Sequence, residues 1–152
     1  MKISTKGRYG LRALIDLAAN SSDEQPVSIS SIASRQYISE AYLEQLMAKL
    51  KKAGLIKSSR GAQGGYQLAR PASEISVGDT LRALEGDTEV VYCPGLHEEG
   101  CSASDRCVTM YVWQKINDSI NRTVDEIMLD TLVRETKQDG NATTALNEKH
   151  NC

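Results

Sequence analysis

Three cysteines lie close together in a 152-residue chain whose first 92 residues contain none. They are Cys93, Cys101 and Cys107, separated by seven and five residues, and Cys152 ends the sequence. Thiolates are the soft ligands that iron–sulfur clusters and zinc prefer, and such sites take about four ligands each. Because the Cys-x-x-Cys pairs of zinc ribbons are missing, the spacing favours a loosely held cluster over a structural zinc site.

The spacing of the cysteines alone does not identify the fourth ligand of such a site. His97 is the best soft donor in the segment, and the other candidates are Glu98, Glu99, Asp105 and Met110. Two interpretations need no metal at all: unligated thiols in a reducing compartment, and a redox-active pair of thiols.

A second group of residues has the chemistry to read base pairs. Gln45 can form two hydrogen bonds with an adenine edge, and Glu44 can accept one from a cytosine amino group. Arg60, within a glycine-rich stretch, suits a narrow minor groove, where the potential is most negative. The expected outward residues of the helix that carries Glu44 and Gln45 are Ser39, Glu40, Ala41, Tyr42, Glu44, Gln45 and Lys49.

These residues need a framework of short helices and a hairpin. Apolar spacing predicts a first helix with its N-cap at Thr5 that runs through Asn20, and Ser28 and Ser39 are expected to cap two further helices. The segments 55–59 and 66–69 alternate as strands on either side of a glycine-rich tip, which predicts a hairpin.

The predicted fold is mainly α with a small β-hairpin wing. Residues 76–79 have the pattern of a capping box that starts a closing helix through Leu84. Helix, short helix, helix and then a glycine-tipped hairpin is the order of a winged helix-turn-helix. We therefore expect a winged helix-turn-helix DNA-binding domain over residues 1–86.

A long helix is expected from about Cys107, after a cysteine-rich loop over residues 87–106. Its narrow apolar stripe needs a partner helix, for which a second copy across a two-fold axis is favoured and packing on the first domain is the alternative. Residues 123–126 are a possible start for another helix. We expect a dimerisation region over 107–134 and a disordered tail over 135–152. The stripe consists of Met110, Trp113, Ile116, Ile120, Val124 and Ile127.

The formal net charge of −2 hides two halves of opposite sign. Residues 1–70 contain eleven Lys and Arg against five acids, a net charge of +6, and residues 71–152 carry −8. A basic half of this kind suits a phosphate-facing module. No apolar run is long enough for a membrane span and no export signal is apparent, so a cytoplasmic protein is expected. With only two histidines and no cofactor fingerprint, the chain is not expected to be an enzyme.

The sequence resembles the IscR/CymR-type winged-helix transcriptional regulators over residues 1–134, and its cysteines make it more similar to the iron–sulfur regulators of the IscR type. The matching segments are MKISTKGRYGLRALIDLA, ISEAYLEQLMAKLKKAGLIKSSRGAQGGYQL, SVGDTLRALEG and CVTMYVWQKI. The resemblance implies a homodimer that binds double-stranded DNA at a pseudo-palindromic operator, and a [2Fe-2S] cluster on Cys93, Cys101 and Cys107. It also implies DNA contacts by Tyr42, Glu44, Gln45, Arg60 and Gly61.

Two departures from the IscR pattern concern the ligands of that cluster. Met110 stands where the resembling regulators carry a histidine, and a thioether is a poor ligand for a ferric site. Two extra residues separate Cys93 from Cys101, around residues 96–99, where His97 is the candidate replacement. The alternative function is a metal-free thiol-sensing or redox-sensing regulator, or a cysteine-metabolism repressor, of the same fold.

Overall fold

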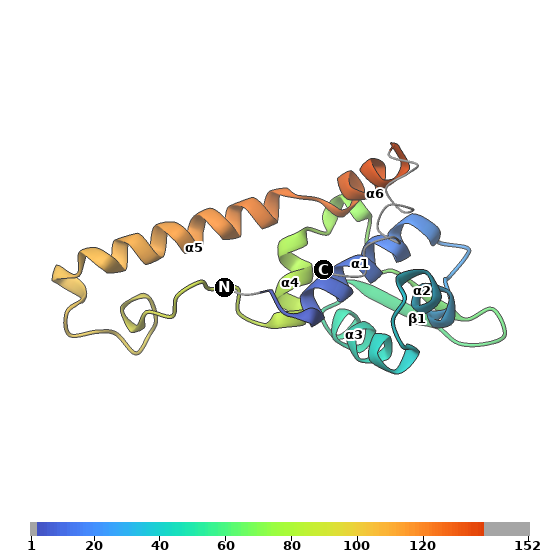
Figure 1. Cartoon of the computed structure of the whole chain (residues 1–152), viewed down its shortest axis with the longest axis horizontal. Helices are drawn as coiled ribbons and strands as arrows, with labels where there is room; N and C mark the ends of the chain where they lie inside the picture. Colours follow the sequence, from blue (N-terminus) through green and yellow to red (C-terminus); the bar gives the residue numbers. More distant parts are fainter. Residues whose placement is uncertain (1–2, 139–152) are drawn as a thin grey trace.

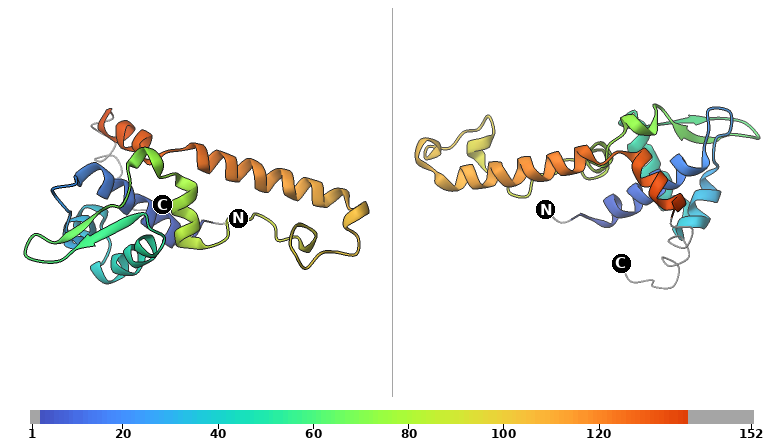
Figure 2. Two further views of the ribbon diagram at one scale, coloured as in Figure 1. Left: turned by 180° about the vertical axis from the view of Figure 1, so that it is seen from behind. Right: turned by 90° about the horizontal axis from the view of Figure 1, so that it is seen from above.

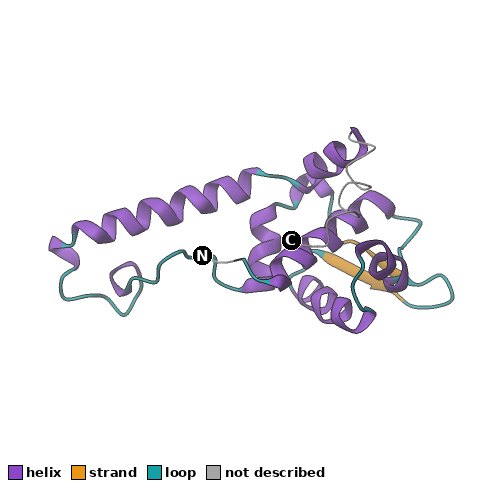
Figure 3. Ribbon diagram, viewed as in Figure 1, coloured by secondary structure: helices purple, strands orange, loops and turns teal. Residues whose placement is uncertain are grey.

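The computed structural model describes residues 3–138, which form six α-helices, three short 3-10 helices and one two-stranded antiparallel sheet (Figures 1 and 3). The fold is therefore mainly α with a hairpin, as the sequence predicts. In chain order the elements are α1 (Thr5–Asn20), α2 (Ile29–Gln36), α3 (Glu40–Lys52), β1 (Ile56–Ser59), β2 (Gly65–Leu68), η1 (Ala72–Glu74), α4 (Val77–Glu85), η2 (Pro94–Leu96), η3 (Ser104–Arg106), α5 (Val108–Glu126) and α6 (Leu129–Gln138).

Serine side chains cap the first four α-helices. Ser28 and Ser39 are the N-caps of α2 and α3, as predicted. Ser76 and Asp79 form the predicted capping box: the Asp79 amide donates to Ser76 Oγ at 2.9 Å, and the Ser76 amide donates to Asp79 Oδ2 at 3.1 Å. The cap predicted at Thr5 is wrong by one residue, because the side chain of Ser4 accepts the hydrogen bond from the Lys6 amide.

One apolar core joins α1–α4, the hairpin and α6. Leu129, the first residue of α6, is only 1% exposed in this core, so the chain returns to α1 after the long helix (Figure 1). A residue from the predicted dimerisation region thus completes the core of the winged-helix body. The largest fully buried side chains are Leu14, Leu17, Ile32, Leu43, Leu46, Met47, Leu50, Ile75, Thr80, Leu84 and Leu129.

The long helix α5 extends away from this core (Figure 2). It continues without a break to Glu126, so the helix start predicted over 123–126 is wrong. The break comes at 127–128, because Ile127 is extended and two backbone bonds pair this joint with the start of α4: Val77 N donates to Ile127 O, and Leu129 N donates to Ile75 O, both at 2.9 Å.

The segment before α5 runs back along the helix and is bound by two asparagines. Asn117, which is 7% exposed, accepts a hydrogen bond from the Val90 amide at 3.0 Å, and Asn121 accepts one from the Thr88 hydroxyl at 2.9 Å. The first turn of α5 is more exposed, with Val108 77% and Tyr111 59% accessible. Of the tail predicted over 135–152, residues 135–138 continue α6 and the rest lies outside the described residues.

A carboxylate at the end of α4 binds the beginning of α1. Glu85 Oε1 accepts hydrogen bonds from the amides of Ser4 and Gly7, each at 2.9 Å, and from Ser4 Oγ at 2.7 Å. Burial alone raises the pKa of Glu85, but these hydrogen bonds and the nearby charge of Lys6 outweigh it and lower that pKa below its ordinary value. Glu85 therefore stays ionised and satisfies donors at the N-terminus of α1.

We predict that Glu85→Gln lowers the free energy of unfolding at pH 7 by about 1–2 kcal/mol, because the donors at the start of α1 lose a charged acceptor. The pKa of Glu85 is lower in the folded state, so its contribution is present above the ordinary glutamate pKa and is lost as the pH falls through the folded value. Urea unfolding of both proteins from pH 7 down to about pH 3 should show the difference shrinking. A difference that does not change with pH would contradict this role.

Candidate nucleic-acid interface and cysteine loop

The N-terminal half of α3 presents most of the predicted base-reading residues together. Glu44 and Gln45 are exposed on one side of the helix, while Leu43, Leu46 and Met47 on the other side enter the core. Ser39 is also exposed, and its hydroxyl accepts the Tyr42 amide at 3.2 Å as the helix cap. The structure thus brings Ser39, Tyr42, Glu44 and Gln45 onto one short stretch of helix.

Tyr42 and Lys49 make contacts within the protein. The Tyr42 ring meets the edge of Tyr9 at a centroid distance of 6.2 Å, and the Arg12 guanidinium lies 5.5 Å from the Tyr9 ring. The Lys49 ammonium donates to the Leu84 carbonyl at 2.9 Å and so compensates the C-terminal end of α4. Lys49 therefore anchors α3 against α4, one helical turn after Gln45.

A buried aspartate orients α2 against α1. Asp16 is 7% exposed, and Arg35 binds its two oxygens through Nε at 2.9 Å and Nη2 at 2.6 Å, while Gln36 Nε2 donates at 2.9 Å. The contact also raises the pKa of Arg35, chiefly through the hydrogen bonds that its guanidinium donates to Asp16. Sequence reasoning missed this pair, although an acid among the apolar residues of the buried face of α1 is a signal for it.

The hairpin joins the helices through backbone hydrogen bonds. Val27 N donates to Tyr66 O at 2.9 Å and Tyr66 N donates to Val27 O at 2.8 Å, so Val27 acts as a one-residue third strand. A Cβ at Gly65 would lie 2.4 Å from Val27 O, and this close approach requires glycine. Arg60 and Gly61 lie at the exposed tip beyond this attachment, where Gly61 has a φ of 115°.

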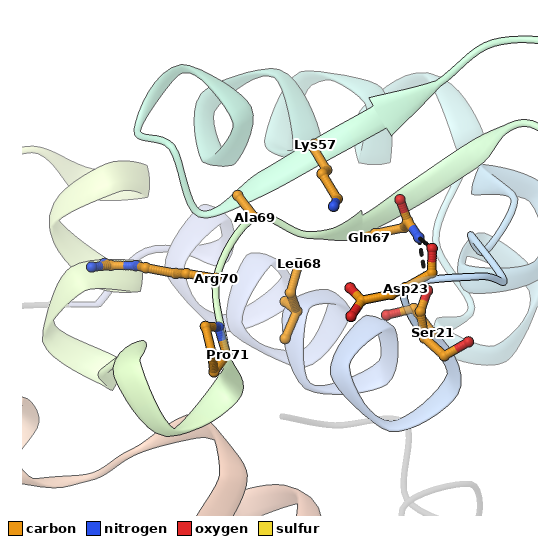
Figure 4. A pocket seen from close by; sticks show the side chains of 9 residues that line it. Ser21, Asp23, Lys57, Gln67, Leu68, Ala69, Arg70 and Pro71 are labelled. Atoms are coloured by element: carbon orange, nitrogen blue, oxygen red, sulfur yellow. Dashed lines mark hydrogen bonds between the residues drawn. The ribbon is translucent and has the colours of Figure 1, made fainter.

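A second attachment lies at the base of the hairpin, beside a cavity of about 470 Å³ (Figure 4). Gln67, which is 6% exposed, donates from Nε2 to the carbonyls of Ser22 and Asp23 at 2.7 and 2.8 Å. Lys57 of β1 and Arg70 after β2 also line this cavity. The wing is therefore bound to the loop between α1 and α2 at two points, and its tip extends from a fixed base.

The three cysteines of the loop are free thiols at the far end of α5. Cys107 is the N-cap of α5, and the hydrogen bond with Thr109 (Sγ···Oγ1 3.1 Å), together with the Met110 and Thr109 amides, lowers the pKa of its thiol. Gly95 faces this first turn so closely that a Cβ there would lie 2.8 Å from Met110 Sδ and 3.6 Å from Cys101 Cβ. Cys101, Gly95 and Met110 are thus neighbours.

The donor chemistry of this loop fits a thiolate-ligated cluster, although the ligands are not gathered. Three free thiols lie on one segment, and that of Cys107 favours the thiolate form needed for ligation. Among the described residues, no three His, Cys, Asp or Glu side chains converge as a metal site. The ligands of such sites are commonly brought together only when the metal binds.

His97 is held by contacts with Glu89 and Tyr92. Its Nε2 lies 3.0 Å from Glu89 Oε2, and its ring stacks on Tyr92 at a centroid distance of 4.7 Å. The Tyr92 hydroxyl in turn donates to Glu99. A carboxylate that binds one ring nitrogen is a common second partner of a metal-ligating histidine.

The two candidate sites lie at opposite ends of the molecule. Figure 1 shows the hairpin tip at one end of the long axis and the cysteine loop at the other, beside the outer part of α5. A helix of 19 residues is about 28 Å long. The loop is connected to the body by α5 and by the segment of residues 87–92 that follows α4. None of the helices within residues 3–138 has the length and apolar character for crossing a bilayer.

Comparison with known sequences gives matches over nearly the whole chain. A model of the Rrf2 family, described as iron-dependent transcriptional regulators, matches residues 3–135. The HTH-type transcriptional regulator IscR of Pectobacterium carotovorum subsp. carotovorum is 42% identical over 133 residues, which cover 88% of this chain and 79% of that protein. The IscR of Aliivibrio salmonicida is 39% identical over 152 residues, covering 97% of this chain and 89% of that protein.

Solved structures show the same fold. CymR (YrzC), the global cysteine regulator of B. subtilis, has a TM-score of 0.72 and 41% identity, covering 90% of this chain and 98% of that chain. T. potens IscR has a TM-score of 0.69 and 46% identity, covering 90% and 88%. These findings confirm the winged helix-turn-helix fold and the resemblance to IscR/CymR-type regulators.

We predict that Gly65→Ala destabilises the fold by about 1–3 kcal/mol, because its Cβ collides with the Val27 carbonyl and the backbone must move. Native-state hydrogen exchange should show faster exchange at the amides of Val27 and Tyr66 than in the wild type. Ala62→Ser, an exposed change in the same hairpin, is the control and should leave both amides protected. Unchanged exchange in Gly65→Ala would show that the attachment of the wing tolerates a side chain there.

Proposed function

The chain belongs to the Rrf2 family of transcriptional regulators, and from this membership and the geometry above we propose that it is a homodimeric, sequence-specific DNA-binding protein that senses an iron–sulfur cluster. The observation that carries the DNA-binding part is the exposed N-terminal half of α3 beside a wing anchored at Val27 and Gln67. A regulator of transcription acts on the chromosome, so we also propose a cytoplasmic location.

Each element has its own part in the proposed DNA complex. The N-terminal half of α3 enters the major groove, where Gln45 and Glu44 contact base edges and Ser39 and Tyr42 contact the backbone. The tip of the wing, with Arg60 and Gly61, follows the minor groove. Lys49 holds α3 against α4 through the Leu84 carbonyl and so contributes as a support.

The exposed apolar start of α5 favours a second copy of the chain as its partner. Val108, Tyr111 and Val112 are 77%, 59% and 41% exposed, while the other end of the same helix packs on α4. A two-fold axis through this helix pair would place the two α3 helices in successive major grooves. The operator is then a pseudo-palindrome with half-sites about 34–36 Å apart, or a multiple of that distance.

The cysteine loop is the proposed sensor. Cys93, Cys101 and Cys107 would hold a [2Fe-2S] cluster, and His97, already oriented by Glu89 and Tyr92, is the proposed further ligand. Such a group supplies a site whose occupancy follows iron and oxidant supply. The chain's own part is to present the thiols and to transmit the resulting order of residues 93–107 to the first turn of α5.

A metal-free sensor of thiols or oxidants is the second candidate. The specific observation in its favour is the lowered pKa of Cys107, because thiolates are the form that oxidants attack. CymR and IscR are similar to this chain to nearly the same degree, so overall similarity does not favour one of the two functions. The cluster proposal therefore rests on the three cysteines.

We predict that Arg60→Ala weakens binding to a duplex selected by the wild-type protein from random sequences by about tenfold or more, while the dimer persists, because the wing loses its groove contact. Fluorescence anisotropy at fixed salt measures the affinity, and size-exclusion chromatography measures the assembly.

Two variants separate this effect from a general loss of charge. Arg134→Ala removes another exposed cation, which lies on α6 and not on the wing, and should leave affinity unchanged. Glu44→Ala should relax the choice of sequence without abolishing binding, because an acceptor for a cytosine amino group is lost. If Arg60→Ala binds as tightly as the wild type, the wing does not read the groove.

We predict that full-length protein purified without oxygen contains about two iron and two acid-labile sulfide per chain, the content of a [2Fe-2S] cluster. Cys101→Ala should lose both, because one of three thiolates is removed, whereas Cys152→Ala should retain them. Colourless protein with stoichiometric zinc would refute the cluster. A Cys93–Cys101 disulfide that forms in peroxide and changes DNA affinity would instead support the metal-free sensor.

A further inference from the structure

Four charged side chains of alternating sign connect the base of the wing to the end of α5. Arg70 Nη2 lies 3.2 Å from Asp79 Oδ2, Arg82 Nη2 lies 3.5 Å from Asp79 Oδ1, and Arg82 Nη2 lies 2.5 Å from Asp125 Oδ1. Arg70 follows β2, Asp79 and Arg82 belong to α4, and Asp125 is on the last turn of α5. Figure 4 shows Arg70 leaving the rim of the cavity at the base of the wing. We call these four residues the ion-pair network.

The start of α4 holds the ion-pair network in place. Burial alone raises the pKa of Asp79, but hydrogen bonds from Ser76 and the charges of Arg70 and Arg82 outweigh it, so that this pKa is lowered. A Cβ at position 78 would lie 1.9 Å from Asp125 Oδ1. Asp125 can therefore lie over the first turn of α4 only because residue 78 is glycine.

Backbone hydrogen bonds reinforce the same connection. Residues 127 and 129, directly after α5, pair with residues 75 and 77, and the latter lie a few positions after Arg70. The end of α5 is thus bound both to α4 and to the segment that leaves the wing. A rotation of α5 at this joint changes the direction of a helix about 28 Å long.

We propose that Arg82, bound between Asp79 and Asp125, is a positioning residue that sets the separation of the two α3 helices on DNA. This inference rests on the proposed function, in which α5 is the dimer contact. Turning α5 by about 10° at its base moves its far end by about 5 Å, which exceeds the rise of one base pair, about 3.4 Å. Exposed ion pairs contribute little to the free energy of unfolding, so we expect variants of Arg82 and Asp125 to remain folded.

The test uses the full-length protein and a duplex that the wild type selects from random sequences. Affinity is measured for this duplex, for duplexes with one base pair added or removed between the half-sites, and for an isolated half-site. Arg82→Gln and Asp125→Asn should each bind the selected duplex about fivefold more weakly or worse. They should lose most of the discrimination between spacings and retain the half-site affinity of the wild type. A defect in folding or in base reading would instead weaken half-site binding.

Three further proteins complete the test. The double variant of Arg82→Gln and Asp125→Asn should be no worse than Arg82→Gln alone, because Arg82→Gln already removes the contact with Asp125. Gly78→Ala keeps every charge but displaces Asp125, so it should lose spacing discrimination even if its unfolding midpoint rises. Arg134→Gln removes a comparable exposed ion pair with Asp130 and should behave as the wild type.

The outcomes separate the two proposals. Retained spacing discrimination in Arg82→Gln, Asp125→Asn and Gly78→Ala would overturn the role of Arg82 and leave the DNA-binding proposal intact. A wild-type protein that selects no two-fold symmetric duplex would overturn both.

Discussion

The backbone pairing of residues 75–77 with 127–129 determines how α5 and α6 are arranged on the rest of the described structure. It ends α5, turns the chain by a short extended step and places Leu129 in the core beside α1. The winged-helix body therefore includes both the first 85 residues and α6, while α5 and the segment before it form a projecting arm. The cysteine loop lies at the tip of that arm, at the end of α5 remote from this joint.

The elements proposed to read DNA are held by polar contacts as well as by the apolar core. The hairpin has short strands, and Val27 and Gln67 attach it to the loop after α1. The second helix has only eight residues, and Arg35 fixes it to the buried carboxylate of Asp16. Such bonds are directional, so they define position more sharply than apolar contacts of the same size. The face of α3 and the wing are thereby oriented relative to each other before DNA is bound.

Local sequence patterns predicted the helices and the hairpin well, but they did not reveal contacts between residues that are far apart in the sequence. The serine caps at residues 28, 39 and 76 follow from side chains that act on nearby amides, and the hairpin follows from its glycines. The cap at Ser4 and the end of α5 depend on Glu85 and on residues 75–77, which are far away in sequence. Asp125 and Arg82 are 43 residues apart, and no periodicity connects them. The cysteine spacing indicated thiolate chemistry, but it gave no distance between the thiols.

The return of α6 to the core also has a consequence for how the protein is made. Leu129 and Val133 pack with helices that leave the ribosome much earlier, and the whole arm must be synthesised in between. Until then the apolar surface of α1 that α6 covers stays exposed on the nascent chain. Folding of the DNA-binding body is therefore completed late in translation, after all three cysteines of the loop have been incorporated. Contacts of such long sequence separation also slow the final step of folding.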